Sequence, residues 1–396
     1  MRGLPLPGRP AAIALFIASV AAFLASPLAW GWSFIDLEVY RGGGQALLDG
    51  APLYRLIFHG FLHFTYPPFA AMVFTPLAAL PNTVLKPIIT IVNIALLPVI
   101  LRVALRLPPV STWLSGEQAT RLALIGAAAA VWLEPVWSTL GYGQINLLIV
   151  ALVVGDLAQR DESRWKGVGI GLACGLKLTP GIFTVYLLLT RRYRAAAVSL
   201  GTFAATLAAG FAVAPRDAAD FWGGAFLDPS RVGRIENAAN QTLRGAFARL
   251  LHSLNVEAWW MATALLVGAL GMLLAVRAGR RGDEACGFSI CALTGLLVSP
   301  ISWSHHWTLA VPVLLLFVVR AHRGRHWFAL AAGGAVAVIG YSQVVHWVPR
   351  PSAASLHVEL HLDAPQLVAA DAYVLLALGA LVIGSVFALR ERRPPI

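Results

Sequence analysis

The chain has few charged residues: Asp, Glu, Lys and Arg make up 12% of its 396 residues. A soluble domain carries roughly 25%. This shortage excludes an ordinary soluble protein. The hydrophobic fraction of 58% and the mean hydropathy of +0.72 favour the membrane class instead. We therefore expect membrane helices through nearly the whole chain, with no separate soluble domain.

Cysteine is also scarce. Cys174, Cys286 and Cys291 all lie in apolar stretches, which makes them packing residues and not a disulfide framework or a metal site. The sequence also lacks an evident internal repeat and any low-complexity tract.

The net charge of +11 has a topological interpretation. The basic residues form short clusters between apolar runs, and no basic helix with interleaved aromatic residues is present, so nucleic acid is excluded as a partner. Short loops rich in Lys and Arg are typical of the cytoplasmic side of a membrane. The clusters expected there are Arg2/Arg9, Arg102/Arg106, Arg160/Arg164/Lys166, Arg191/Arg192/Arg194, Arg277/Arg280/Arg281, Arg320/Arg323/Arg325 and Arg390/Arg392/Arg393.

These clusters predict the number of crossings. Each stretch between two inner clusters must leave and return, so it contains an even number of helices. We predict an all-α, polytopic membrane protein with a single domain over residues 1–396. It has about twelve transmembrane helices and both termini in the cytoplasm. The apolar run at 11–28 is long for a signal peptide and is expected to be the retained first helix.

Two segments do not fit simple crossings. Residues 65–81 are apolar but short and interrupted by proline, so we expect a re-entrant or interfacial helix on the outer side. Residues 167–190 have the length of one span, yet both flanks are basic. A break at 177–180 predicts two short helices there, which places Lys177 in a protein-lined or watery cavity.

The outer side is expected to consist of polar patches at 32–66, 134–146, 214–257 and 299–307, with a plain loop at 348–366. Asp36 lies in the first patch. It either caps a helix running from Leu37 towards Leu48 or takes part in chemistry. Only 19 acidic residues serve the chain, which favours a functional role for one near the outer end of a helix.

Four further groups in these regions are polar. Gln144 and Asn146 either cap a helix start or hydrogen-bond a sugar. Lys177 binds an anion or snorkels to the interface, and a lysine inside a membrane segment favours binding. His305 and His306 contact a phosphate or sugar, or form an interfacial belt with Trp303 and Trp307. In the long loop the polar cluster comprises Asn240, Gln241 and Arg244, preceded by Arg231 and Arg234. An arginine there either recognises a phosphate or is an exposed loop charge, and the loop charge is favoured for Arg231.

Six sequence blocks occur in this order: FIDLEVYRGG, HFTYPPFAAMVF, VWLEPVWSTLGYGQINLL, GLACGLKLTPGIF, RVGRIENAANQTLRGAFAR and LVSPISWSHHWTLAVP. Together they resemble the polyprenol-phosphate-mannose-dependent alpha-(1→2)-mannosyltransferases of actinobacteria, glycosyltransferase family 87. Within that family the likeness is to the enzymes that build phosphatidylinositol mannosides and lipoarabinomannan. The blocks span residues 34–312, most of the chain.

The resemblance implies the membrane glycosyltransferase C architecture, with an active site beneath a catalytic outer loop at 32–66 and a second long outer loop at 214–257. It also implies that Asp36 is the general base. The donor partner would be polyprenyl-phosphate-mannose. The acceptor would be a mannose of a glycolipid such as a phosphatidylinositol mannoside, lipomannan or lipoarabinomannan, extended through an alpha-(1→2) linkage with inversion. The implied location is the plasma membrane, with the active site facing the extracytoplasmic side.

Roles for the polar residues follow. The leaving group is a phosphate, so cations should stabilise it; the candidates, in order of preference, are Lys177, His305, His306 and Arg244. Sugar and acceptor contacts are expected from Gln144, Asn146, Asn240, Gln241, Tyr66 and Glu38. Because Glu38 is the one other carboxylate close to Asp36 in sequence, we expect no obligatory metal and no cofactor besides the lipid-linked donor.

Two alternatives remain. One is the transfer of a lipid-linked pentose such as arabinose. The other is a non-catalytic transporter of lipid-linked sugars, which would use Lys177 as part of a phosphate path. Transporters often contain inverted repeats, and none is evident here.

Overall fold

The computed structural model describes residues 6–324, 333–334, 340, 343–351 and 355–389, and it is mostly helical. The α-helices are α1 (Arg9–Ala25), α2 (Ile35–Leu48), α3 (Pro68–Ala78), α4 (Asn82–Ala104), α5 (Gly116–Ala130), α6 (Glu134–Tyr142), α7 (Asn146–Leu157), α8 (Val168–Leu176), α9 (Gly181–Leu189), α10 (Tyr193–Val213), α11 (Pro215–Trp222), α12 (Leu243–Leu250), α13 (Glu257–Arg280), α14 (Glu284–Val298), α15 (Ala310–Arg323), α17 (Ala364–Ala370) and α18 (Ala372–Leu389). The strands β1 (Ile57–Phe58) and β2 (Leu62–His63) form an antiparallel hairpin with Ile57 opposite His63.

Several helices have the length and composition of membrane spans. Within the described residues these are α4, α10, α13 and the helix that runs through η6 (Ser304–Leu309) into α15. These are 4 helices, or up to 6 if the bent pairs α5–α6 and α17–α18 each form one span. Shorter apolar helices are α1, α3, α7 and α14. The chain therefore has the helices of a multi-pass membrane protein, while twelve crossings stay a prediction.

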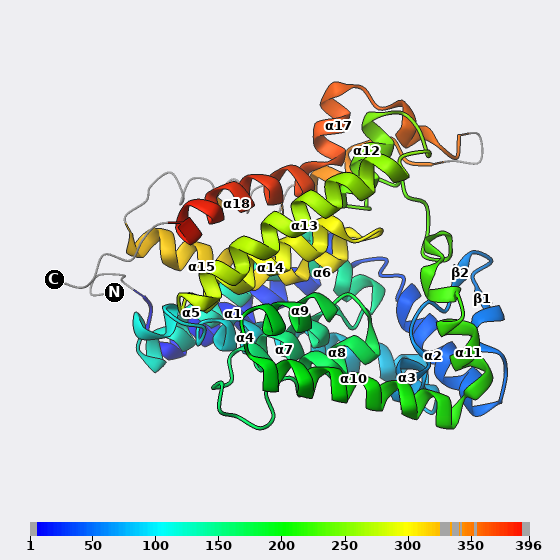
Figure 1. The fold of residues 1–396 in the computed structure, drawn as a ribbon, viewed down its shortest axis with the longest axis horizontal. Helices are drawn as coiled ribbons and strands as arrows, with labels where there is room; N and C mark the ends of the chain where they lie inside the picture. The colour runs from blue at the N-terminus through cyan, green and yellow to red at the C-terminus, as the bar shows by residue number, and fades with distance from the viewer. Residues whose placement is uncertain (1–5, 325–332, 335–339, 341–342, 352–354, 390–396) are drawn as a thin grey trace.

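The bundle has two distinct ends. In Figure 1 the long helices run roughly along the horizontal axis, and α2, the β1–β2 hairpin and α11 gather at one end. The two predicted outer loops, 32–66 and 214–257, thus meet at the same end. The long loop is itself largely structured, because it contains α11 and α12.

The break predicted at 177–180 is present, with α8 before it and α9 after it. Small residues bring α8 against α10: a Cβ at Gly171 would lie 2.6 Å from the Ser199 carbonyl oxygen, and one at Gly175 would lie 2.6 Å from Thr206 Oγ1. Close backbone approach through small residues four apart is typical of membrane helix pairs. This packing sets the position of Lys177, directly after α8.

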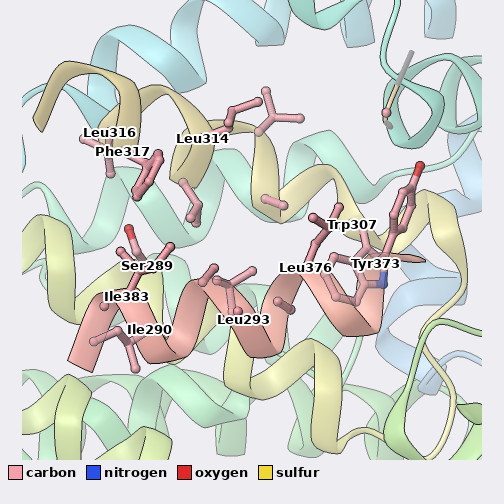
Figure 2. A pocket seen from close by; sticks show the side chains of 18 of the residues that line it. Ser289, Ile290, Leu293, Trp307, Leu314, Leu316, Phe317, Tyr373, Leu376 and Ile383 are labelled. Carbon is pink, nitrogen blue, oxygen red and sulfur yellow. The ribbon is translucent and has the colours of Figure 1, made fainter. Parts of the chain in front are cut away.

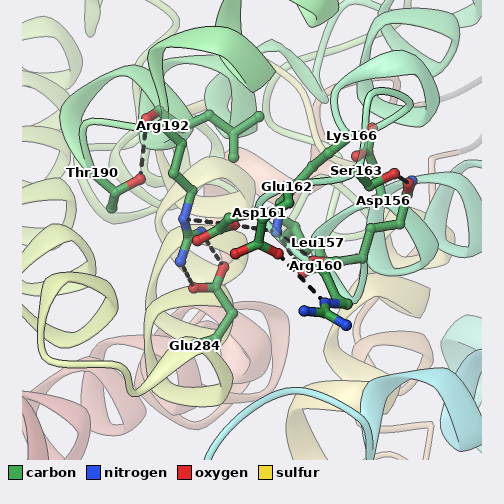
Figure 3. A network of polar contacts seen from close by, with 12 residues as sticks. Asp156, Leu157, Arg160, Asp161, Glu162, Ser163, Lys166, Thr190, Arg192 and Glu284 are labelled. Carbon is green, nitrogen blue, oxygen red and sulfur yellow. Dashed lines mark hydrogen bonds and ion pairs between the residues drawn. The ribbon is translucent and has the colours of Figure 1, made fainter.

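Both flanks of the α8–α9 pair lie at the same end of the bundle, as the basic clusters predicted. Asp161 pairs with Lys166 at 2.8 Å and with Arg192 at 3.3 Å, which joins the loop before α8 to the turn after α9 (Figure 3). The Arg192 guanidinium also donates to Glu284 at the start of α14, 2.8 Å away. The chain between these two basic clusters therefore starts and ends at the same end of the bundle. Arg2, Arg325, Arg390, Arg392 and Arg393 of the other predicted clusters lie outside the described residues.

Two hydrophobic cores hold the molecule. The larger joins α4–α7 with α9, α14, α15 and α18. The smaller packs α2 on α3, where Tyr40 stacks on Phe74 with ring centroids 4.5 Å apart. Residues 65–81, predicted as a re-entrant or interfacial helix, thus contain α3, a short helix whose apolar side covers α2; its depth in a membrane stays a prediction.

The plain loop predicted at 348–366 is wrong in part. It contains the short helix η8 (Val358–His361) and the start of α17, where Asp363 and Gln366 form a capping box. His252 Nδ1 lies 2.6 Å from the Leu360 carbonyl oxygen, and His357 pairs with Glu236 at 2.8 Å. These contacts fasten the segment onto the long outer loop, so it packs as part of that end of the molecule.

Candidate active site

A cavity of about 1150 Å³ opens where the two outer loops meet. Its walls come from α2, the loop before α3, the α6–α7 turn, the α8–α9 break, α12, the start of α13 and η6. The sequence-predicted residues that line it are Asp36, Tyr66, Gln144, Lys177, Arg244, His305 and His306. Segments far apart in the sequence thus bring most of the candidate polar side chains to one space.

Asp36 lies in the first turn of α2 and faces this cavity. It does not cap the helix: the N-cap is Phe34, in a left-handed conformation with φ of 51°, and Phe34 N–H donates to the Gly141 carbonyl at 2.8 Å. Burial raises the pKa of the Asp36 carboxyl from 3.8 to about 6, while a Gln144 hydrogen bond and the Lys177 charge lower it. A carboxyl with this pKa ionises near neutral pH and can accept a proton.

Tyr40, which the sequence analysis did not single out, hydrogen-bonds two of the residues that line the cavity. Tyr40 follows Asp36 by one helical turn, and its hydroxyl donates to Gln144 Oε1 at 2.5 Å. The same hydroxyl lies 2.9 Å from the Tyr66 hydroxyl. The Gln144 side chain therefore accepts a hydrogen bond from the Tyr40 hydroxyl and also hydrogen-bonds the Asp36 carboxyl. The sequence could have indicated Tyr40, because residues four apart, such as Asp36 and Tyr40, lie on the same face of a helix.

Lys177 points into the protein. It adopts an extended conformation directly after α8, and its Nζ lies 2.8 Å from His306 Nε2 and 3.3 Å from Asn146 Oδ1. The ammonium also lies 5.9 Å from the Tyr66 ring centroid. The side chain thus reaches the cavity that Asp36 faces.

His305 and His306 both line the cavity and belong to the 3₁₀ helix η6. Their ring centroids lie 4.8 Å apart, and the two rings are nearly perpendicular. His305 Nε2 is buried and has no hydrogen-bond partner within the described protein. The alternative of a belt with the neighbouring tryptophans is wrong for Trp307, which is 4% exposed and packs in the larger core, while Trp303 lines the cavity.

The Asn146 side chain contacts both Lys177 and the backbone of His305. Its Nδ2 donates to the His305 carbonyl oxygen at 2.9 Å, and its Oδ1 accepts from Lys177. It begins α7 without capping it, since no side-chain cap bond is present there. Asn146 therefore ties η6 to the α8–α9 break, and its side chain lines a smaller recess shared with Lys177 and His306.

Glu134 supports η6 from beneath and was not singled out by the sequence analysis. This fully buried carboxylate accepts hydrogen bonds from the Ser304 hydroxyl at 2.8 Å and the Tyr373 hydroxyl at 2.9 Å. An acid in the apolar block VWLEPVW was the available signal, because a charge in such a run is costly.

Arg244 reaches the cavity from α12. It is 7% exposed, its Nη2 donates to Glu257, and its guanidinium lies 5.2 Å from the Trp260 ring centroid. Its Nε and Nη1 are buried and have no acceptor within the described protein.

Besides Asn146, three predicted sugar-binding residues do not line this cavity. Asn240 Nδ2 donates to the Ile235 carbonyl at 2.9 Å, and its Oδ1 accepts from Ser302 N–H at 3.0 Å. Gln241 bridges backbone groups of Ala238 and Tyr373, and both amides are fully buried. Both side chains fasten the long loop and are not available to a sugar.

The third is Glu38. Two residues after Asp36, it points to another side of α2, where it lies 2.8 Å from His59 and 3.8 Å from Lys86. It does not line the cavity.

A second cavity, of about 350 Å³, lies among α14, α15 and α18. Figure 2 shows that its walls are mainly apolar, with Leu293, Leu316 and Phe317 among them. Among the described residues that line it, the polar side chains are Ser289, Arg320 and Tyr373. In the part of the chain that the structure describes, no group of three or more His, Cys, Asp or Glu side chains could hold a metal ion; whether a metal is needed stays a prediction.

Comparisons with known proteins agree with the resemblance noted in the sequence. The model of glycosyltransferase family 87 matches residues 64–300. The chain is 34% identical over 331 residues to the polyprenol-phosphate-mannose-dependent alpha-(1-2)-phosphatidylinositol mannoside mannosyltransferase of Mycobacterium tuberculosis, covering 80% of this chain and 76% of that protein. It is 36% identical to the protein of the same name from Mycolicibacterium smegmatis, covering 78% of each.

A third relative is the polyprenol-phosphate-mannose-dependent alpha-(1-2)-phosphatidylinositol pentamannoside mannosyltransferase of Mycolicibacterium smegmatis, 35% identical over 82% of each chain. No solved structure matches the chain significantly.

Proposed function

The chain belongs to glycosyltransferase family 87, and from this premise we propose that it transfers mannose from polyprenyl-phosphate-mannose to a mannosylated phosphatidylinositol. The product linkage in this proposal is alpha-(1→2), formed onto a mannose of the acceptor with inversion at the anomeric carbon. The names of three relatives support this donor and this class of acceptor. The proposed acceptor class includes lipomannan and lipoarabinomannan.

The observation that carries the proposal is the placement of one carboxylate opposite one lysine in a single cavity. Asp36 and Lys177 both face this space, and the Lys177 charge acts on the Asp36 carboxyl. In the proposed reaction Asp36 takes the proton of the acceptor hydroxyl, and the hydroxyl oxygen forms a bond to the anomeric carbon. The bond from that carbon to the phosphate oxygen breaks, and polyprenyl phosphate leaves with the electron pair.

The cations then have a defined task. Negative charge grows on the departing phosphate, and a fixed ammonium stabilises it more in the transition state than in the ground state. Lys177 supplies this charge. Two histidines are the neighbouring groups. Neutral His306 accepts the Lys177 hydrogen bond at Nε2, and His305 Nε2 has no partner among the described residues. Gln144 and Tyr66 border the same space and are proposed to contact the sugar.

The proposal includes a membrane arrangement. We place both termini in the cytoplasm, the 32–66 and 214–257 loops outside, and the cavity at the outer surface, where lipid-linked sugars can enter sideways from the bilayer.

The test is a transfer assay with purified protein, labelled polyprenyl-phosphate-mannose and phosphatidylinositol mannosides. Wild type should label the glycolipid, and Asp36→Asn should lower kcat about 10²- to 10⁴-fold with little change in donor binding, since general-base catalysis contributes about that much. An Asp36→Asn protein that retained most of its turnover would overturn the base assignment. Label from polyprenyl-phosphate-arabinose in place of the mannose donor would establish the pentose alternative, and donor movement without transfer would establish a transporter.

A further inference from the structure

The proposed reaction brings two lipid phosphates to one cavity, the donor's and the one that links the acceptor's inositol to its glycerol. Among the described residues, the Lys and Arg side chains that line the cavity are Lys177, Arg231 and Arg244. They come from different elements: the α8–α9 break, the long outer loop and α12. The question is which cation receives which phosphate.

The chemistry places the donor phosphate near Asp36. The attacked carbon is bonded to that phosphate and must lie within reach of the hydroxyl whose proton Asp36 takes. Lys177 lines the same cavity as Asp36, its ammonium lies 5.9 Å from the Tyr66 ring centroid, and its charge acts on Asp36. The proposed reaction therefore assigns the donor phosphate to Lys177. The acceptor phosphate is separated from the reacting mannose by the inositol and any intervening sugars, so it must be bound at a distance from Asp36.

Arg244 has the free hydrogen-bonding capacity for such a phosphate. Glu257 accepts from Nη2 only, which leaves Nε and Nη1 buried without an acceptor within the described protein. A buried N–H without an acceptor is costly, so this arrangement favours a ligand oxygen at that position. The planar guanidinium suits a phosphodiester, and the Trp260 ring below it holds it in place.

The depth of Arg244 also fits a phospholipid headgroup. Its partners Glu257 and Trp260 lie in the first turn of α13, a helix of membrane-spanning length. Trp259 and Trp260 at this helix end are typical of the membrane–water interface. Further along α13, Leu265 and Leu266 are 75% and 59% exposed, as expected for a lipid-facing side. If α13 spans the bilayer, its first turn and Arg244 lie at the depth of the lipid headgroups.

We infer that Arg244 binds the phosphodiester of the acceptor's phosphatidylinositol anchor, a site distinct from the donor phosphate site at Lys177. This inference rests on the proposed function and assigns its acceptor side. With the phosphate held at Arg244, the acyl chains reach the bilayer beside α13, and the sugars extend through the cavity towards Asp36.

The experiment compares two acceptors, a phosphatidylinositol mannoside and an alkyl mannoside that has no phosphate. Arg244→Gln should raise the KM for the phosphatidylinositol mannoside about tenfold or more, because it removes charge-assisted hydrogen bonds. The KM values for the alkyl mannoside and for the donor should stay unchanged. Arg244→Lys, which keeps the charge, should recover part of the loss.

Arg231→Gln is the matched control, since it removes the same charge from the same cavity. Arg231 is only half-buried, and its Nη2 donates to the Tyr54 carbonyl at 2.7 Å. Its loss should change the KM for the phosphatidylinositol mannoside by no more than about fivefold. An equal effect of the two variants would mean general electrostatic attraction and would overturn a specific site at Arg244.

Other outcomes also decide the inference. A raised donor KM in Arg244→Gln would assign Arg244 to the donor phosphate. Equal losses with both acceptors would indicate a sugar contact or a structural role, and no change would leave the site without support. Each of these results overturns it.

A binding measurement keeps the inference testable without turnover and covers the case in which Arg244→Gln does not fold. Fluorescent phosphatidylinositol mannoside should bind Asp36→Asn protein, and the added Arg244→Gln change should weaken that binding. Glu257→Gln, which removes the competing negative charge beside Arg244, should strengthen it. If Glu257→Gln had no effect and binding were independent of Arg244, the inference would fail while transfer by wild type still stood. If wild type transferred no mannose, the proposed function itself would fail.

Discussion

Asp36 is the residue through which pH should act on this protein. It lies in α2, outside the spans, and burial raises the pKa of its carboxyl to about 6. Below that pH the carboxyl is protonated and cannot accept the acceptor's proton. We predict that kcat/KM rises with pH through about 6, as measured in transfer assays from about pH 5 to 7. A rate that stayed level across this range would contradict the assignment.

Lys177 should determine donor affinity. Replacing it with alanine removes a charge-assisted contact to phosphate, so the donor KM should rise about 10- to 100-fold with little change in acceptor KM. The kcat should fall as well, because the same charge stabilises the departing phosphate in the transition state. The acid limb of the pH profile should also move to higher pH, because the Lys177 charge lowers the pKa of Asp36.

The control for this variant is Lys86→Ala, a partly exposed lysine that pairs with Glu38 at 3.8 Å. It should leave donor KM and the acid limb in place. A lysine that only anchored the protein at the interface would show the same indifference, so an unaffected Lys177→Ala enzyme would disprove the phosphate contact.

At the scale of elements, the packing of α8 on α10 holds the α8–α9 break in position. A Cβ at Gly171 would meet the Ser199 carbonyl at 2.6 Å, and this backbone oxygen cannot move independently of α10. Gly171→Ala should therefore destabilise the protein by about 1–3 kcal/mol. It should lower the melting temperature in detergent and weaken donor binding through displacement of Lys177.

Gly201→Ala provides the comparison, because nothing lies within 4 Å of a Cβ at that position of α10. Alanine is a better helix former than glycine, so this variant should be neutral or slightly stabilising. Equal melting temperatures for the two variants would mean that the close approach at Gly171 is unimportant.

Element boundaries show what local sequence can predict. Residues 177–180, which include Lys177 and Pro180, separate α8 from α9. This break can be predicted from the sequence because it depends on neighbouring residues. The capping alternative for Asp36 is wrong, because α2 begins at Ile35, with Phe34 as its N-cap in a left-handed conformation and the Phe34 N–H donating to the Gly141 carbonyl. That contact comes from a distant segment.

At the scale of the molecule, the arrangement in the membrane awaits a labelling experiment. Asp49→Cys lies in the predicted outer loop and Gly282→Cys in a predicted inner one, and both positions are exposed. An impermeant thiol reagent should modify the first in intact cells and the second only after permeabilisation. The native Cys174, Cys286 and Cys291 are buried and should give little background. The reverse pattern would invert the topology, and labelling of both from outside would break the even-crossing rule.

The composition and the local pattern of the sequence determined the class of this protein. A chain with so large an apolar fraction cannot bury all of its apolar runs in a water-soluble fold. Hydropathy, basic clusters and prolines are features of neighbouring residues, so the helices and the α8–α9 pair could be predicted from the sequence. Asp36 was found through scarcity of acids and through the ordered blocks of the family. Its partner Lys177 stood out because a buried lysine is costly wherever the chain places it.

Only the tertiary structure decided which polar residues share the cavity. Asn240 and Gln241 looked equal to Gln144 in sequence, but their amides are taken up by backbone groups, including that of Tyr373 far along the chain. Glu134 became visible as the support of η6 only through Ser304 and Tyr373. Hydrogen bonds between distant segments depend on how helices pack, and packing is a property of the whole chain that no local pattern contains.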